Sequence, residues 1–474
     1  MANRMLIAAL SAALLGGCAL QPAYQRPASP VPVTYPAGEA YAGSQAHPAR
    51  GPSTGAASTT PPARGAASVA ADIGWRNFFV DPRLQRLVEL SLQNNRDLRV
   101  AVLNAEKVRA QYQIQRSALF PQLGAAASST ARNGVPRNDL AQFTAAWEID
   151  LFGRLRSLSD VAQEQYFASA YGRQAAQTLL VSQVADQYLT VLAYDEELAV
   201  TQRTLDTAQA SYKLVKLQFD TGTASELDLR QSQIVVDRAQ SSHAAQVRQR
   251  AQAENALVLL LGQSLPADLP PQAPLGAQTL TGIPAGLPSD LLARRPDILQ
   301  AEALLRSENA NIGAARAAFF PQITLTGAIG SGAWSFVPAL VEPIFDAGRN
   351  KANLDVATLE KDIGIAQYEK AIQTAFREVS DGLAARGTYD DQLAALQRET
   401  DAQQRRLDLA NSLYENGVNS YLDVLTAQTD LYNDQISLSS ARLDQLTSRV
   451  NLYRALGGGW LERTMDAHPT TGAP

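Results

Sequence analysis

The sequence predicts a mainly α-helical chain with a smaller β part, in which one structural plan occurs twice. Two proline-free segments of about 65 residues, 154–219 and 349–414, are rich in Ala, Gln, Leu, Glu and Lys, which is typical of very long helices. Each follows a region that mixes β-branched, small and aromatic residues between turn signals, which indicates strands. Short motifs also recur in the same order. These observations predict two similar repeats, at 72–262 and 286–459, joined by a linker at 263–285.

The recurring motifs carry the evidence for this duplication. They are spaced 200 residues apart near the start of each repeat and 195 residues apart farther along. Several pairs in register at nearly constant spacing are the signature of an internal repeat. The pairs are Asp97-Leu98 and Asp297-Ile298, Phe120-Pro121-Gln122 and Phe320-Pro321-Gln322, Gly153-Arg154 and Gly348-Arg349, Gly222 and Gly417, Leu227-Asp228 and Leu422-Asp423, and Leu261-Gly262 and Leu456-Gly457.

Each repeat is expected to contain the same elements in the same order. A first helix begins at Asp81-Pro82, with Asp as N-cap and Pro at the first helical position, and continues to about Ala118. Its counterpart covers about 296–319. Two β-hairpins follow, and the second has only Gly330-Ser331-Gly332-Ala333 at its tip, which predicts a short loop. The predicted strands are 122–132, 141–152, 322–332 and 334–345.

The long segments are expected to form helical hairpins. At about 1.5 Å per residue, a helix of about 65 residues measures roughly 100 Å, about three times the hydrocarbon core of a bilayer. Such helices must project away from a membrane. Second helices are expected to return from Gly222 to Gly262 and from Gly417 to Gly457. In the last helix a coiled-coil seam is predicted at Leu422, Leu425, Thr429, Tyr432, Ile436, Ser439, Leu443, Leu446, Val450 and Tyr453.

The first residues predict a lipoprotein signal peptide at 1–17. Arg4 precedes an apolar stretch that ends in Leu15-Gly16-Gly17-Cys18, so Cys18 would become the lipidated first residue of the mature chain. A buried thiol is the alternative. Because Cys18 is the only cysteine, no internal disulfide can form. Residues 18–71 are Pro/Ala/Gly-rich and are expected to form an extended tether, and residues 460–474 a flexible tail.

Charge and motif content argue against two other classes of protein. The net charge of −5 includes no basic run that could follow a phosphate backbone, so nucleic acid is not an expected partner. The chain lacks the zinc-binding H-E-x-x-H and the phosphate-binding G-x-x-x-x-G-K motifs, and His47, His243 and His468 lie far apart in the sequence. We therefore expect no enzymatic activity, no cofactor and no metal.

Four strands per chain are too few to close a transmembrane barrel, because the smallest have about eight. If the strands span a membrane, an oligomer is required, and a dimer with eight strands and a trimer with twelve both remain open. Aromatic residues near the strand ends are expected to form an interfacial girdle. The alternative is the core of a small β domain. These residues are Phe120, Phe143, Trp147, Phe152, Phe320, Trp334, Phe336 and Phe345.

Six motifs together are characteristic: LLGGC at 14–18, AWEIDLFGR at 146–154, LLARRPDI at 291–298, AAFFPQITL at 317–325, PIFDAGR at 343–349 and NGVNSYLDVLTAQ at 416–428. They resemble the outer membrane factors, in particular the lipoprotein NodT/OprM-like branch of the TolC group. The resemblance implies a homotrimeric TolC-like tunnel, in which each chain gives four strands to a 12-stranded transmembrane β-barrel and long helices to a periplasmic α-helical barrel. It also implies a lipid anchor in the outer membrane, a periplasmic adaptor, an inner-membrane pump commonly of the RND type, and passive export of drugs or toxic small molecules.

The turns between paired helices are the predicted adaptor-docking tips, at Gly222, Thr223 and Ser225 and at Gly417, Val418 and Ser420. Helix capping also explains these residue types, because Gly ends helices and S-x-x-D begins them. By resemblance, a periplasmic gate should lie just inside the tips. Its candidates are Leu422 and Asp423, with Asp228 in the first repeat and Thr426 where the resemblance favours an acid, so that Asp423 is either a gate residue or only a cap.

Two alternatives remain open at this point. One is a TolC-like channel for type I protein secretion, and the other is a periplasmic coiled-coil adaptor or scaffold lipoprotein. An adaptor is expected to have one helical hairpin, whereas this sequence predicts two. The repeats also differ in the coiled-coil seam, in the second β-hairpin and around the gate candidates, which predicts that the second repeat opens more readily than the first.

Overall fold

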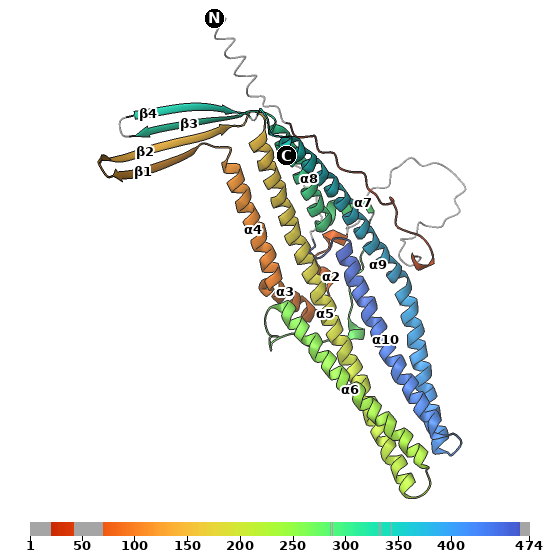
Figure 1. Cartoon of the computed structure of the whole chain (residues 1–474). Coiled ribbons are helices and arrows are strands. Elements are labelled where there is room, and N and C mark those ends of the chain that lie inside the picture. Colours follow the sequence, from red (N-terminus) through yellow and green to blue (C-terminus); the bar gives the residue numbers. More distant parts are fainter. Residues whose placement is uncertain are drawn as a thin grey trace, which may run out of the picture. The chain divides into compact units, whose positions relative to one another are not determined.

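The computed structural model describes residues 20–41, 70–284, 286, 288–330, 333–342 and 344–464 (Figure 1). The predicted signal peptide and Cys18 lie outside these residues, as does the chain after Thr464. The described residues belong to two compact units. Unit 1 contains residues up to 31, 100–174 and 296–374, and unit 2 contains residues 32–99, 175–295 and those from 375 onward.

The first helix predicted in repeat one is two helices, α3 (Pro82–Asn94) and α4 (Arg96–Ser117). Asp81 caps α3 as predicted, because its carboxylate accepts the N–H of Arg83 at 2.7 Å. Asn95 then interrupts the helix with an extended backbone, φ −61° and ψ 130°. Its side-chain oxygen accepts the N–H of Leu98 at 2.8 Å and so begins α4. The prediction of one continuous helix is therefore wrong.

The second repeat has the same interruption at Arg295, 200 residues after Asn95. It separates α7 (Pro288–Arg294) from α8 (Pro296–Ala317). A residue that precedes proline is disfavoured in the helical region, so Arg295 ends α7 and Pro296 begins α8. The predicted start at Pro296 is confirmed, whereas α7 was missed.

The long helical hairpins are confirmed. Helices α5 (Arg154–Asp220) and α9 (Arg349–Glu415) contain 67 residues each, and their predicted ends are correct to within one residue. Helices α6 (Glu226–Leu261) and α10 (Tyr421–Ala455) return along them, as Figure 1 shows. Within the described ranges, no helix combines the length and the apolar character needed to cross a membrane.

Four strands form one antiparallel sheet in the order β1-β2-β3-β4. They are β1 (Gln122–Arg132), β2 (Val135–Ile149), β3 (Gln322–Gly330) and β4 (Ala333–Val341). Both predicted hairpins are confirmed, but β2 begins six residues before the predicted start at 141 and ends three residues before the predicted end at 152. β2 also pairs with β3. Because Arg132 pairs with Val135, the first hairpin has a two-residue turn, and the pairing of the second hairpin extends to Gly330 and Ala333. The second hairpin is smaller because its strands have nine residues each, against 11 and 15 in the first.

Residues 20–41 lie against the folded chain, although the sequence predicts a free tether. Arg26 forms a two-point ion pair with Glu302 of α8, with Nη2–Oε2 at 2.6 Å and Nε–Oε1 at 2.9 Å, and Glu302 is only 2% exposed. Near the start, Arg316 Nη1 donates to the carbonyl of Leu20 at 3.2 Å. The tether prediction is wrong for these residues because polar contacts with α8, together with the ring of Tyr35 stacked on Phe376 of α9 at 5.4 Å, hold the segment in place without large aliphatic side chains.

The last described residues also pack against α2 (Trp75–Phe78), a short helix that the sequence did not predict. The rings of Phe78 and Tyr453 stack with centroids 4.0 Å apart, and the backbone N–H of Trp75 donates to the carbonyl of Leu461 at 2.9 Å. The predicted flexible tail therefore cannot begin before residue 464. Three single-turn 3-10 helices complete the described elements: η1 (Glu39–Tyr41), η2 (Ala70–Asp72) and η3 (Leu275–Ala277).

Candidate functional site: the hairpin tips and the base of the sheet

Each hairpin turn begins with a glycine in the left-handed region of φ. The angle is 79° at Gly222 and 72° at Gly417. In both turns the N–H of the glycine and the N–H that follows donate to carbonyls in the last turn of the long helix. A Cβ added to either glycine would meet no atom within 4 Å. Glycine is thus required by the backbone conformation and not by packing, and both turns are open to an approaching partner.

The residues after the turns cap the returning helices. The N–H of Ser225 donates to Asp228 at 3.2 Å, and the N–H of Asp228 donates to the Ser225 hydroxyl at 3.1 Å. In the second repeat, the N–H and the hydroxyl of Ser420 donate to Asp423 at 3.3 and 3.0 Å. The capping interpretation is confirmed at both sites. Capping occupies one carboxylate oxygen of Asp228 and one of Asp423, the two acids predicted for the gate.

Beneath the turns, the two hairpins pack on each other within unit 2. The hydroxyl of Tyr414 on α9 donates to Gln218 on α5 at 2.9 Å. The rings of Tyr414 and Tyr421 are 5.4 Å apart, and burial raises the pKa of Tyr421. The buried cluster consists of Val215, Ala410, Tyr421, Val424, Leu425 and Ala427. Apolar packing therefore fixes the two turns relative to each other.

The gate candidates of the second repeat lie on the opposite side of α10 from this cluster. Leu422 is 55% exposed, and Asp423 and Thr426 are exposed as well. The hydroxyl of Thr426 donates to the carbonyl of Leu422 at 2.8 Å. The predicted seam is therefore wrong at its first position, because the buried register at this end of α10 starts at Tyr421 and Val424. In the first repeat Asp228 is half-buried.

Farther along α10 lie two further acids, Asp430 and Asp434, which were not among the predicted site residues. Asp430 pairs with Arg406 of α9 at 2.6 Å. One turn later, one oxygen of Asp434 is buried without a hydrogen-bond partner in the described structure. Burial and the nearby carboxylates of Glu399 and Asp430 raise the pKa of Asp434. Asp430 and Asp434 are four residues apart and therefore lie on one face of the helix. This spacing of two acids is visible in the sequence and could have predicted them as a pair.

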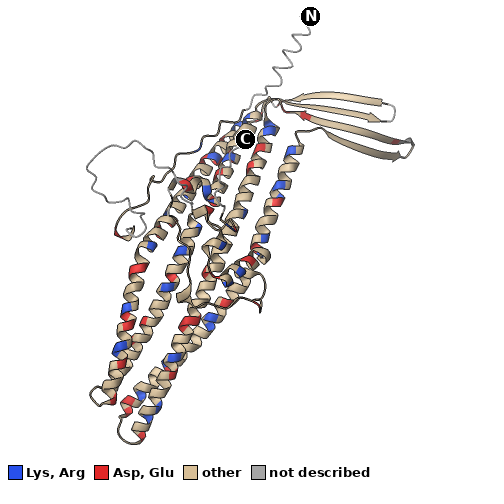
Figure 2. Ribbon diagram, turned by 180° about the vertical axis from the view of Figure 1, so that it is seen from behind, with Lys and Arg blue, Asp and Glu red and all other residues tan. Residues whose placement is uncertain are grey.

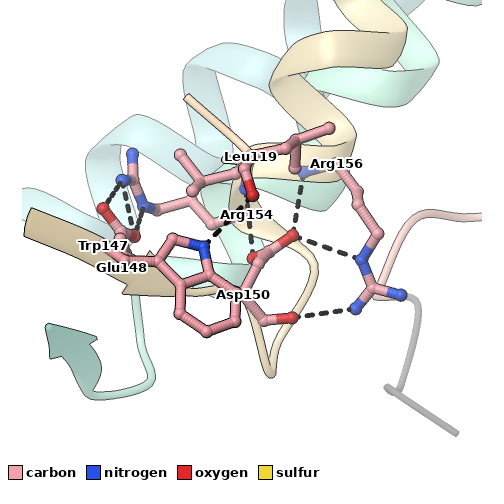
Figure 3. Close-up of polar contacts among 7 residues, drawn as sticks. Leu119, Trp147, Glu148, Asp150, Arg154 and Arg156 are labelled. Carbon is pink, nitrogen blue, oxygen red and sulfur yellow. Dashed lines mark hydrogen bonds and ion pairs between the residues drawn. The ribbon is translucent and has the colours of Figure 1, made fainter. Parts of the chain in front are cut away.

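At the other end of α5, a polar network joins β2 to the helix (Figure 3). Arg154 donates to both carboxylate oxygens of Glu148, at 2.7 and 2.8 Å. The carboxylate of Asp150 accepts the backbone N–H groups of Leu155 and Arg156 at 3.1 and 2.9 Å and also pairs with the Arg156 side chain. Asp150 thus caps α5 and stabilises the turn from strand to helix.

The second repeat makes the equivalent turn with different contacts. Asp346 accepts the N–H groups of Gly348 and Asn350 at 2.9 and 2.8 Å, and these bonds lower the pKa of its carboxyl group. The side chain of Asn350 donates to the carbonyl of Ala318 at 2.9 Å and so links α9 to the end of α8. Both turns are therefore capped by an aspartate.

The sheet has one apolar face and one face of mostly small or polar residues. The paired register puts Phe143, Ile329 and Trp334 in one cross-strand row. Strands are almost free of charged residues in Figure 2, whereas the helices carry many. The side chains on the apolar face are Leu123, Ala125, Ala127, Ala141, Phe143, Ala145, Trp147, Ile149, Ile323, Leu325, Ile329, Trp334, Phe336, Pro338 and Leu340, and near the tip of the first hairpin Ser129 and Asp139 lie on this same face. Those on the other face include Gly124, Ser128, Gln142, Thr144, Thr324, Thr326, Ala328 and Ser335.

None of the eight aromatic residues predicted for the girdle is buried in the single chain. Trp334 is 77% exposed and Phe345 is 87% exposed. Near the helices, the rings of Phe152 and Phe320 stack at 4.6 Å, and the indole N–H of Trp147 donates to the carbonyl of Leu119 at 3.1 Å. The alternative of a small β-domain core is therefore wrong, because these side chains need a cover that one chain does not supply.

Comparisons with known proteins identify a family and several relatives with the same architecture. Residues 87–263 and 287–458 match the family model described as "Outer membrane efflux protein". The chain is 45% identical to the toluene efflux pump outer membrane protein TtgC of Pseudomonas putida, over 99% of this chain and 98% of that protein. It is 39% identical to outer membrane protein OprJ of Pseudomonas aeruginosa, over 97% of each chain.

Solved structures show the same fold. The open state of the Neisseria gonorrhoeae MtrE outer membrane channel is 36% identical, with a TM-score of 0.82 over 95% of this chain and 100% of that one. The CusC channel is 35% identical, with a TM-score of 0.78 over 93% of this chain and 100% of that one. The family model matches the chain in two successive segments, and the fold is that of TolC-like outer membrane channels. This chain belongs to the outer membrane efflux protein family.

Proposed function

We propose that three copies of this chain form a passive outer-membrane channel that is the exit duct of a tripartite efflux system. The single observation that carries this proposal is the four-stranded sheet with one apolar and one polar face. Strands that line an aqueous pore in lipid alternate in this way, with apolar residues outward. The polar interior imposes no fixed chemical selection, so the substrate is chosen upstream.

The need for several copies follows from the strand order. β1 and β4 are the edges of the sheet, and each has one side without a partner strand in the described chain. Backbone groups must be paired in lipid, which only closed barrels achieve for strands. Pairing of β4 with β1 of the next copy supplies this closure. Three copies give the twelve strands that resemblance to the TolC group implies.

The hairpin tips are the proposed docking site for a periplasmic adaptor. The turns at Gly222 and Gly417 have no side chain and open space around the Cα, so the backbone of a partner can approach closely. Leu422, Asp423 and Thr426 are exposed beside the second turn and are the proposed gate, which three copies would form together. Because these three side chains are exposed in the single chain, they are free to contact other chains at the tips.

The proposed substrates are small toxic compounds. Relatives at 44 to 45% identity are named for toluene, solvent and antibiotic efflux. We propose the same class for this chain, with an inner-membrane pump of the RND type. These names favour small-molecule efflux over the alternative of protein secretion. Membership in the outer membrane efflux protein family excludes the periplasmic adaptor alternative.

Anchoring through Cys18 is a further part of the proposal. The described chain starts two residues after Cys18, at Leu20, which is bound to α8. Mass spectrometry of the mature protein should find a diacylglyceryl and an acyl group on an N-terminal Cys18. An unmodified N-terminus, or cleavage elsewhere, would contradict the anchor without affecting the channel.

The channel is tested with full-length protein extracted from membranes in detergent. Native mass spectrometry should give three chains, and planar bilayers should show discrete conductance steps without added energy source. A strain that lacks the gene should lose tolerance to toluene and regain it with the wild-type gene. A protein that is extracted without detergent and runs as a single chain would overturn the proposal.

A further inference from the structure

The four helices that meet the sheet all carry basic residues in the turn nearest to it. α4 and α8 end with Arg116 and Arg316 in their last turns. α5 begins with Arg154 and Arg156, and α9 begins with Arg349 and Lys351. All these residues belong to unit 1. Figure 2 shows blue ribbon segments at helix ends next to the strands, which have almost no charged residues.

Two of these side chains have local carboxylate partners and four do not. Arg154 pairs with Glu148, and Arg156 pairs with Asp150. The other four, which we call the basic collar, are Arg116, Arg316, Arg349 and Lys351. All four are exposed, and none forms an ion pair within 4 Å in the described part of the chain.

The carboxylates nearest the basic collar neutralise it only in part, because Asp346 and Glu342 supply two negative charges against its four positive ones. Asp346 caps α9 through two backbone N–H groups, and the charge of Arg349 also helps to lower the pKa of Asp346. Glu342, at the end of β4, is exposed. The collar therefore presents an excess of positive charge to its surroundings.

Helix capping explains only half of the basic collar. Positive charges at helix C-termini interact favourably with the helix dipole, which suits Arg116 and Arg316. Arg349 and Lys351 are at the N-terminus of α9, where the dipole disfavours them and where acids are normally found. The helix dipole therefore does not account for these two residues, whereas an external anion beside them would be attracted by both.

The position of the basic collar identifies that partner. From the sheet toward the helices, an apolar face gives way to the exposed rings of Phe320 and Phe345 and then to the collar. This order of apolar, aromatic and basic side chains matches the passage from hydrocarbon to headgroups. Arg316 also holds the carbonyl of Leu20, and the two residues that lead back to Cys18 span at most about 7 Å.

We propose that the basic collar binds the phosphate groups of anionic phospholipids in the leaflet that faces the helices. This inference rests on the proposed membrane orientation of the channel. Phospholipid phosphates complement exposed Arg and Lys side chains at the headgroup level, where basic residues attract anionic lipid. The contacts fix the depth of the channel in the membrane, at the level at which the N-terminal segment begins.

The test measures the lipids that remain bound to the intact trimer. Protein in nanodiscs of phosphatidylethanolamine and phosphatidylglycerol is extracted with mild detergent, and native mass spectrometry counts each lipid. Wild type should retain phosphatidylglycerol above its proportion in the disc. The triple variant R116Q/R349Q/K351Q, which leaves the Arg316 contact with Leu20 intact, should lose this enrichment, by about fivefold in affinity for each charge removed.

The control is the triple variant R109Q/K361Q/K370Q, which removes three positive charges from the same two helices farther from the sheet. It should retain lipid as wild type does. Equal retention by collar variant and wild type, or equal loss in both variants, would overturn the inference. Single-channel conductance separates this failure from failure of the proposed function, because the collar variant should still conduct, whereas a wild type without conductance would refute the channel itself.

Discussion

The two repeats interrupt their first helical segment at equivalent positions but stabilise the interruption with different chemistry. In the first repeat, the neutral side chain of Asn95 donates to the carbonyl of Leu260 at 2.9 Å. In the second, Arg295 donates to the carbonyl of Ala455 at 3.0 Å and also pairs with Glu378 at 2.8 Å. Leu260 and Ala455 are 195 residues apart, like the other equivalent positions. The two repeats thus share the backbone arrangement but differ in charge at this position.

The largest expected effect is at the charged interruption. Arg295 is 5% exposed, so Arg295→Met removes the closest positive partner of Glu378 and a hydrogen-bond donor to the carbonyl of Ala455. Removing one partner of a buried ion pair costs about 3–5 kcal/mol, and we expect about 3 kcal/mol here because the Glu378 side chain is 24% exposed and keeps Arg454 at 3.9 Å. Asn95→Ala should cost only about 1–2 kcal/mol, for one cap and one hydrogen bond. Denaturant unfolding of the detergent-solubilised protein gives both values, and equal losses would show that charge adds nothing at Arg295.

The second comparison concerns the glycines that end the returning helices. Both have positive φ, 69° at Gly262 and 86° at Gly457. A Cβ at Gly262 would lie 2.3 Å from the carbonyl oxygen of Asn94, whereas one at Gly457 would lie 3.3 Å from that of Arg294. Gly262→Ala should therefore cost about 3 kcal/mol, and Gly457→Ala about 1 kcal/mol from backbone strain alone.

The melting temperature of the trimer, measured by scanning fluorimetry, ranks these two variants. Gly417→Ala is the matched control, because its φ of 72° is similar and its surroundings are open. If Gly262→Ala were no less stable than Gly417→Ala, the close packing against Asn94 would not contribute to stability.

The sequence predicts most of this architecture because its strongest signals are local. Long proline-free segments, Gly222 and Gly417 as helix ends, and the S-x-x-D caps need no tertiary information, and all are confirmed. The misses have tertiary causes. The interruption at Asn95 depends on a carbonyl 165 residues away, and the docking of residues 20–41 depends on buried Glu302. Leu422 fits the periodicity of the seam, but the packing of Tyr421 and Val424 determines which face is buried.

A third difference between the repeats predicts a pH dependence of stability. Burial raises the pKa of Asp186 on α5 from 3.8 to about 7, against the opposing effect of Arg454. Its equivalent in the second repeat, Asp381, is exposed. Since the folded state keeps the Asp186 proton to higher pH than the unfolded state, stability contributed by this group is complete below pH ~4 and falls as pH rises to ~7.

The expected loss is about 3 kcal/mol between pH 4 and pH 7, because each pH unit over which only the folded state holds the proton contributes about 1.4 kcal/mol. Asp186→Asn should remove this part of the pH dependence. Asp381→Asn, which replaces an exposed carboxylate, should leave this part unchanged. Thermal unfolding at several pH values measures it. A profile for Asp186→Asn that parallels the wild type would show that Asp186 ionises alike in both states.

The smallest expected effect on stability is at the tips, where the repeats can be compared in function. Leu422→Ala with Asp423→Ala should raise single-channel conductance, because it removes the exposed gate candidates of α10. Leu227→Ala with Asp228→Ala loses an equivalent exposed leucine and an equivalent helix cap. Each pair should therefore lower the free energy of unfolding by about 1 kcal/mol, mainly from the cap. Planar-bilayer recordings decide the issue: a conductance rise only in the second-repeat pair assigns the gate to α10, and a rise in both pairs adds Asp228 of the first repeat to the gate. Wild-type conductance of the second-repeat pair would refute a gate in that repeat.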